Sequence, residues 1–69
     1  MRFRKIEIGT YQVLTMRGYI GTVYKLKWIG HAVEWKAVGP GYSMRGFQTR
    51  QSAADALARN DRERAFKNE

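Results

Sequence analysis

The sequence predicts an α+β domain in which a small antiparallel sheet of three to five strands packs on one C-terminal helix. Residues 1–38 are rich in Ile, Val, Tyr, Thr and Trp, in short runs broken by glycine, which is a composition typical of strands. The gaps between these runs are too short for the crossovers that parallel strands need, so neighbouring strands are expected to be antiparallel. The stretch "GFQTRQSAADALA" at 46–58 then has the composition of a chain entering a helix.

Five strands are expected, separated by turns that contain glycine. The clearest turn is "GPG" at 39–41, because Pro40 fixes its own φ and the flanking glycines accept positive φ. The segment 3–16 is either two strands or one bent strand. Residues 20–47 therefore form the core of the sheet, and residues 1–19 add one strand or two to it. The expected strands lie near 3–8, 11–16, 20–28, 31–38 and 42–47.

A single helix is expected over residues 49–66. Thr49 is a candidate N-cap, since its hydroxyl can accept a hydrogen bond from a backbone N–H of the first turn. Ser52 stands where a capping box would have Glu. The small side chains that follow allow the helix to approach a sheet closely while keeping helix propensity high. These residues are Ala53, Ala54, Ala56, Leu57 and Ala58.

Alternation of side chains along the strands sorts the sheet into two faces. The apolar face needs a cover, which the alanine-rich helix is expected to supply. This face is expected to consist of Tyr24, Leu26, Val33, Trp35, Tyr42 and Met44. The opposite face is then exposed, provided that no β-bulge interrupts the alternation. It is expected to carry Lys25, Lys27, Lys36 and Arg45, with Glu34 as its one acid.

The composition indicates one small domain spanning residues 1–69. The chain has no cysteine, which excludes disulfides and thiolate metal sites and suits a reducing cytoplasm. The N-terminal residues "MRFRKIEIG" lack the apolar run of a signal peptide, and no window approaches the roughly 18–20 apolar residues of a membrane span. We therefore expect a cytoplasmic protein with no membrane partner.

The net charge of +7, from 13 Lys and Arg against six Asp and Glu, predicts a partner that carries phosphates or an acidic surface. Residues 1–49 hold eight basic and two acidic side chains, a net of +6. Residues 50–69 hold five basic and four acidic ones, a net of +1. The excess of positive charge thus lies outside the helix, which argues against a basic recognition helix.

Short motifs in residues 20–58 resemble those of two related groups of DNA-binding domains. The motifs are "WKA" at 35–37, "FQT" at 47–49 and "AADA" at 53–56. The chain is similar here to the DNA-binding domain of plant ethylene-response factors and to the N-terminal arm-binding domain of tyrosine recombinases and their phage relatives. In these domains a three-stranded sheet lies in the DNA major groove, and a helix supports it from behind.

The resemblance implies a role for each matching residue. Trp35 and Ala37 would lie in the core. Helix–sheet packing would involve Phe47, Ala53, Ala54 and Ala56. The strand positions that face DNA would be Lys25, Lys27, Lys36, Ser43 and Arg45. The plant domains carry several arginines and a tryptophan on that face, whereas this chain offers mostly lysines, and bidentate reading of guanine is chiefly an arginine property.

The sequence contains no constellation for catalysis. His31 is the only histidine and adjoins Gly30 at an expected turn, while Ser43 and Ser52 have no evident base and orienter. Metal ligands at useful spacing, paired carboxylates and phosphate-binding glycine loops are missing. We expect neither an enzyme nor a metal or organic cofactor. Trp28, at an expected strand end, is a candidate for stacking on single-stranded nucleic acid.

The favoured interpretation is a small nucleic-acid-binding protein that uses the lysine-rich face of its sheet on double-stranded DNA. The alternative is a small phage-type protein-interaction module, such as an inhibitor of a host protein, whose basic face meets an acidic protein surface. An RNA-binding module is a further alternative. We expect a monomer, because Arg2, Arg4 and Lys5 oppose by charge the pairing of the N-terminal edge strand with a second copy.

Overall fold

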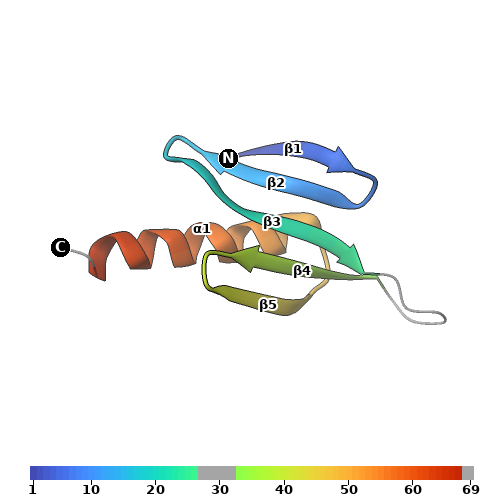
Figure 1. Cartoon of the computed structure of the whole chain (residues 1–69). Helices are drawn as coiled ribbons and strands as arrows, with labels where there is room; N and C mark the ends of the chain where they lie inside the picture. Colours follow the sequence, from blue (N-terminus) through green and yellow to red (C-terminus); the bar gives the residue numbers. More distant parts are fainter. Residues whose placement is uncertain (27–32, 68–69) are drawn as a thin grey trace.

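The computed structural model describes the backbone of residues 1–26 and 33–67, and the side chains of 1–26 and 33–63. Five strands form one antiparallel sheet in the order β1-β2-β3-β4-β5, followed by one helix, which confirms the predicted fold class (Figure 1). The segment 3–16 contributes two strands, β1 and β2. The elements are β1 (Arg2–Glu7), β2 (Thr10–Thr15), β3 (Gly18–Leu26), β4 (Glu34–Gly39), β5 (Tyr42–Phe47) and α1 (Arg50–Lys67).

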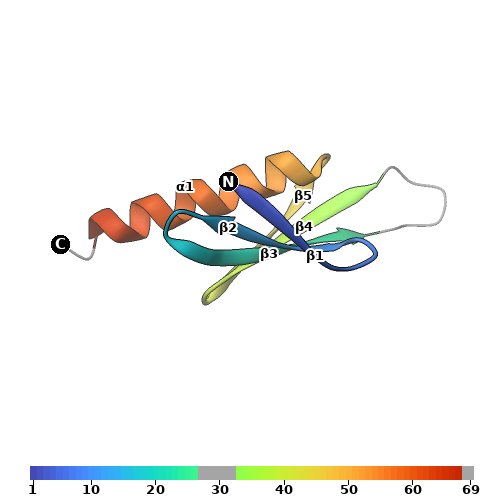
Figure 2. The same cartoon turned by 90° about the horizontal axis from the view of Figure 1, so that it is seen from above.

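The helix α1 lies along one face of the sheet, so the described part of the chain has two layers (Figure 2). It packs mainly on β3, β4 and β5. The fully buried core joins sheet and helix side chains, namely Val13, Ile20, Val23, Ala37, Ala53, Ala54 and Leu57. Larger side chains surround this core, and they are Phe3, Tyr11, Trp35, Tyr42, Met44 and Phe47. No helix in the described residues is long and apolar enough to cross a membrane.

Close approach of α1 to β3 depends on Gly21. A Cβ at this position would lie 2.7 Å from the carbonyl oxygen of Val38 and 2.9 Å from both δ-methyl groups of Leu57. Gly21 does not have a positive φ, so glycine is needed here for space and not for backbone conformation. The fully buried Ala53 and Ala54 keep the helix equally close to the sheet.

Within the described strands, three β-bulges interrupt the pairing, so simple alternation does not hold along every strand. Ile6 is the extra residue of β1 opposite β2, and Ile20 is the extra residue of β3 opposite Val13 and Leu14 of β2. In β5, the extra residue lies between Met44 and Phe47, where Gly46 has a φ of 91°. This bulge places Met44 and Phe47, three residues apart, on the same face of the sheet, where both pack against the core.

The predicted apolar face is correct for β4 and β5 but reversed in β3. Trp35, Tyr42 and Met44 pack against the core as expected. In β3, however, it is Val23 that faces the helix, opposite Ala37, while Tyr24 is 37% exposed on the other side. Leu26 is also misplaced, since it lies on the same side as Tyr24. Val33 precedes β4 and is 41% exposed, so it is not part of the buried core. A tyrosine at the place of Val23 would hold the alanine-lined helix away from the sheet, which is why the smaller residue faces inwards.

The start of α1 is capped as predicted. The hydroxyl of Thr49 accepts a hydrogen bond from the backbone N–H of Ser52 at 3.0 Å. The same hydroxyl donates to Oγ of Ser52 at 2.9 Å, so Ser52 takes a side-chain bond with the cap where a capping box would place Glu. These two hydrogen bonds fix the connection between β5 and the first turn of α1.

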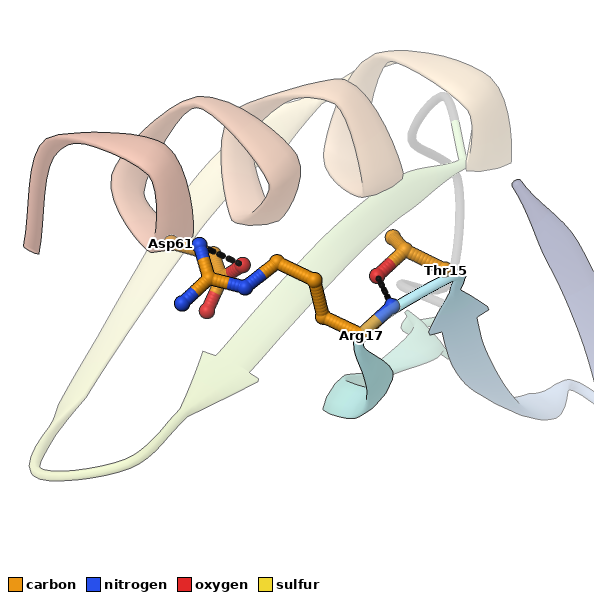
Figure 3. A network of polar contacts seen from close by, with 3 residues as sticks. All are labelled: Thr15, Arg17 and Asp61. Atoms are coloured by element: carbon orange, nitrogen blue, oxygen red, sulfur yellow. Dashed lines mark hydrogen bonds and ion pairs between the residues drawn. The ribbon is translucent and has the colours of Figure 1, made fainter. Parts of the chain in front are cut away.

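The turn between β2 and β3 is linked to the second half of α1. Arg17 in this turn forms an ion pair with Asp61, with 3.6 Å between Nη1 and Oδ2 (Figure 3). The backbone N–H of Arg17 also donates to the hydroxyl of Thr15 at 3.1 Å. The pair is partly exposed, so it contributes at most about 1 kcal/mol and mainly orients the turn toward the helix.

We predict that Gly21→Ala lowers the free energy of unfolding by about 1–3 kcal/mol, the usual cost of overpacking a core. The Leu57 methyl groups can rotate away from the new Cβ, but the carbonyl oxygen of Val38 belongs to a paired strand and cannot move freely. Chemical denaturation followed by circular dichroism measures the change. Ser43→Ala, at an exposed position of the same sheet, is the control and should change stability by less than about 0.5 kcal/mol. Equal stability of Gly21→Ala and the parent would contradict the close approach of α1 to β3.

Candidate nucleic-acid interface

The sheet face opposite α1, here called the outer face, carries side chains in register across all five strands. Neighbouring residues in this register point to the same side of the sheet, so a row crosses the outer face from β1 to β5. One row consists of Arg4, Gln12, Thr22, Val38 and Ser43. The next row contains Thr10, Tyr24 and Lys36. Arg45 lies opposite Lys36 at the β5 bulge and reaches Glu34 on this same face.

Three of the predicted site residues lie together on the outer face. Lys36 is half-buried beside Tyr24, and Ser43 and Arg45 are exposed on β5. Lys25 is not with them, because it pairs with Trp35 on the face covered by α1. This corrects the expected position of Lys25 and follows from the reversed orientation of β3. Lys27 and Trp28, the candidate stacking residue, lie outside the described residues.

Two arginines of β1 belong to the outer face and were not among the predicted site residues. Phe3 faces the helix side, where its ring packs under the guanidinium of Arg50. Arg2 and Arg4 flank Phe3 along the strand and therefore point to the outer face, both exposed. The alternation "RFR" indicates that the two arginines share one face of a strand. It assigns them to the outer face only together with the pairing of β1 with β2 in the same sheet.

The acidic side chains of the outer face are few among the described residues. Glu34 binds Arg45 through Nε and Oε2 at 3.0 Å, with side-chain exposures of 28% and 53%. Glu7 lies at the end of β1, opposite Thr10 in the strand register. Arg2, Arg4 and Lys36 have no ion-pair partner within the described part of the chain. The outer face thus keeps a net positive charge after its internal ion pair is counted.

A buried threonine lies at the centre of the outer face. Thr22 is buried, and its hydroxyl shares a 2.7 Å hydrogen bond with the hydroxyl of Tyr19. Around it, Gln12, Tyr24 and Lys36 present an amide, a phenol and an ammonium group. These groups can donate hydrogen bonds to oxygen and ring-nitrogen acceptors. The residues that the structure describes include no group of three or more His, Cys, Asp or Glu side chains that could hold a metal ion.

Known protein families, curated proteins and solved structures were compared with the chain, and none of them matches it. The resemblance to sheet-type DNA-binding domains therefore depends on the motifs in residues 20–58.

Proposed function

We propose that the protein binds double-stranded DNA through the outer face of its sheet. The observation that carries this proposal is the location of α1, which covers one face of the sheet and leaves a basic face uncovered. Phosphate contacts would come from Arg2, Arg4, Lys36 and Arg45, with Ser43 as a further hydrogen-bonding group. Lysine and arginine contacts to phosphates supply most of the affinity of such an interface.

The dimensions of the sheet suit a duplex groove. Strands in a sheet are about 4.8 Å apart, so the four spacings from β1 to β5 span roughly 19 Å before twist is considered. The major groove is about 12 Å wide. A sheet laid over the groove would bring its central strands above the base edges and its edge strands above the two phosphate backbones.

The arrangement of side chains agrees with that placement. Arg4 lies on β1 and Arg45 on β5, at opposite edges of the sheet. Gln12, Tyr24 and Lys36 lie on the strands between them. Edge arginines would then neutralise phosphates on both strands of the duplex, while the central polar groups would face the bases. The helix stays on the far side as a support, as the resemblance to sheet-type DNA-binding domains implies.

We predict that Arg4→Glu combined with Lys36→Glu abolishes duplex binding while the fold persists. Arg4 is exposed, where substitutions usually change stability by no more than about 0.5 kcal/mol, and Lys36 is half-buried at the outer face beside Tyr24. The matched control is Arg59→Glu with Arg62→Glu, which changes the net charge by the same amount on exposed positions of α1. Fluorescence anisotropy with a labelled duplex measures binding, and circular dichroism verifies folding.

The dependence of binding on salt gives a second measurement of the same interface. With three or four phosphates neutralised, the slope of log K against log salt concentration should be about −3 to −4 for B-DNA. The Arg4/Lys36 variant should lose binding and the Arg59/Arg62 variant should keep it. The reverse ranking would assign binding to the helix. No binding by the parent at low salt would reject the proposal in favour of a protein partner.

We predict that Glu34→Gln tightens duplex binding. The substitution removes a carboxylate from the outer face and, with it, the ion pair between Glu34 and Arg45. An exposed ion pair is worth less than about 1 kcal/mol, so the gain should be roughly threefold in Kd. Glu63→Gln, at an exposed position of α1, removes the same charge and should leave Kd nearly unchanged. Weaker binding by Glu34→Gln would mean that the pair positions Arg45 for the contact.

A further inference from the structure

A second basic site lies on the opposite side of the sheet, beside the start of α1. It is a cavity of about 610 Å³, called here the cationic cleft. Its charged lining is Lys5, Lys25 and Arg50, and the aromatic rings of Tyr11 and Trp35 form its walls, with Ile8 at the rim. No carboxylate is among the described residues that line it.

Strand pairing explains why these residues meet. Lys5 is opposite Tyr11 in the β1–β2 pair, and Lys25 is opposite Trp35 in the β3–β4 pair. The rings of Tyr11 and Trp35 lie 6.1 Å apart and connect the two pairs. The backbone N–H of Lys25 donates to the carbonyl oxygen of Gly9 at 2.7 Å, which holds the β1–β2 turn against β3. Both lysines are therefore positioned by backbone hydrogen bonding.

Arg50 is held by the aromatic rings around it. Its guanidinium carbon lies 4.3 Å from the ring centre of Phe3 and 4.6 Å from that of Tyr11. Stacking of this kind fixes the plane of the guanidinium and leaves its N–H groups at the edge. The guanidinium of Arg50 forms no hydrogen bond or ion pair with any described residue. Its N–H donors are therefore oriented by the rings and have no partner within the described part of the chain.

The combination of charges and rings selects a particular chemistry. Three cations that surround one cavity repel each other, and an anion with several negative charges would relieve that repulsion. Inorganic phosphate would satisfy the cations but leave the aromatic walls exposed. A nucleotide offers phosphates for the cations and a planar base for the rings, since bases stack on aromatic side chains. The cavity volume also falls within the range of about 300–1,000 Å³ that is usual for small-ligand sites.

We propose that the cationic cleft binds a nucleotide, with Lys5, Lys25 and Arg50 on its phosphates and its base against Trp35 and Tyr11. This site is separate from the outer face and does not depend on duplex binding there. The nucleotide has two possible sources, a free nucleoside phosphate or the 5′-phosphorylated end of a nucleic-acid strand. The shared recognition element in both is a phosphate attached to a nucleoside.

Isothermal titration calorimetry at about 0.15 M salt, where charges on the two faces are largely screened from each other, tests this proposal with ATP, inorganic tripolyphosphate and adenosine. We expect ATP to bind more tightly than tripolyphosphate, and adenosine not to bind measurably. Lys25→Gln and Arg50→Gln should each weaken ATP binding by on the order of tenfold, because each removes a charge-assisted contact. Lys36→Gln, which removes one positive charge from the outer face, is the matched control and should leave ATP binding within about twofold of the parent. Circular dichroism verifies that each variant is folded.

Oligothymidylates with and without a 5′-phosphate identify the source. Tighter binding of the phosphorylated strand, lost in Lys25→Gln, would support the site and assign it to strand ends if ATP binds less tightly. Tighter ATP binding would assign it to free nucleotides. The proposal is wrong if neither ligand binds, or if Lys36→Gln weakens ATP binding as much as Lys25→Gln, since net charge alone would then explain the affinity. Duplex binding by the Lys25→Gln variant distinguishes failure at this site from failure of the outer face.

Discussion

The contact between α1 and β3 at Gly21 determines how the rest of the sheet is arranged. Leu57 and the carbonyl oxygen of Val38 occupy the space that a side chain at Gly21 would take. Because the helix lies this close, only small or medium side chains fit beneath it, and Val23 and Ala37 fill that position. Once Val23 faces the helix, Tyr24 must face away from it and Lys25 must share the helix side with Trp35. A single steric constraint thus decides which charged residues appear on which face.

The helix covers only part of the width of the sheet, and both candidate sites result from this partial cover. α1 packs mainly on β3, β4 and β5, so the β1–β2 hairpin extends beyond its cover (Figure 1). On the helix side, the overhang leaves the space that Lys5, Lys25 and Arg50 surround. On the outer face, β4 contributes Lys36 and β5 contributes Arg45, and the same hairpin adds Arg2 and Arg4. The hairpin is held in place by the aromatic contacts of Phe3 and Tyr11 near Arg50 and, at its connection to β3, by the ion pair of Arg17 and Asp61.

Local sequence signals predicted the elements well, because each strand, turn and cap depends on nearby residues. The five strands, the Thr49 cap and the orientation of Trp35, Tyr42 and Met44 were all accessible in this way. The orientation of β3 was not, since it depends on Leu57, which lies 36 residues after Gly21. Alternation starting from Tyr24 and Leu26 assigned the larger apolar residues of β3 to the core. Nothing in the composition indicated the bulge at Ile20. For the candidate site, Lys36, Ser43 and Arg45 were therefore grouped correctly on one face, Lys25 was placed on the wrong face, and Arg2 and Arg4 were missed.

Residues Tyr24 and Lys25 are adjacent in β3 but belong to opposite faces, so the two proposed sites are separated by little more than the thickness of the sheet. The two faces of one sheet lie closer together than two stacked sheets, which pack about 10 Å apart, and the Debye length at 0.1 M salt is also about 10 Å. An anion in the cationic cleft would lower the positive potential at the outer face, and a bound duplex would lower it at the cleft, with equal coupling in both directions. The coupling should be strong at 0.01 M salt, where the Debye length is about 30 Å, and weak at physiological salt. Each proposed ligand would then weaken the binding of the other through charge, across the single layer of the sheet.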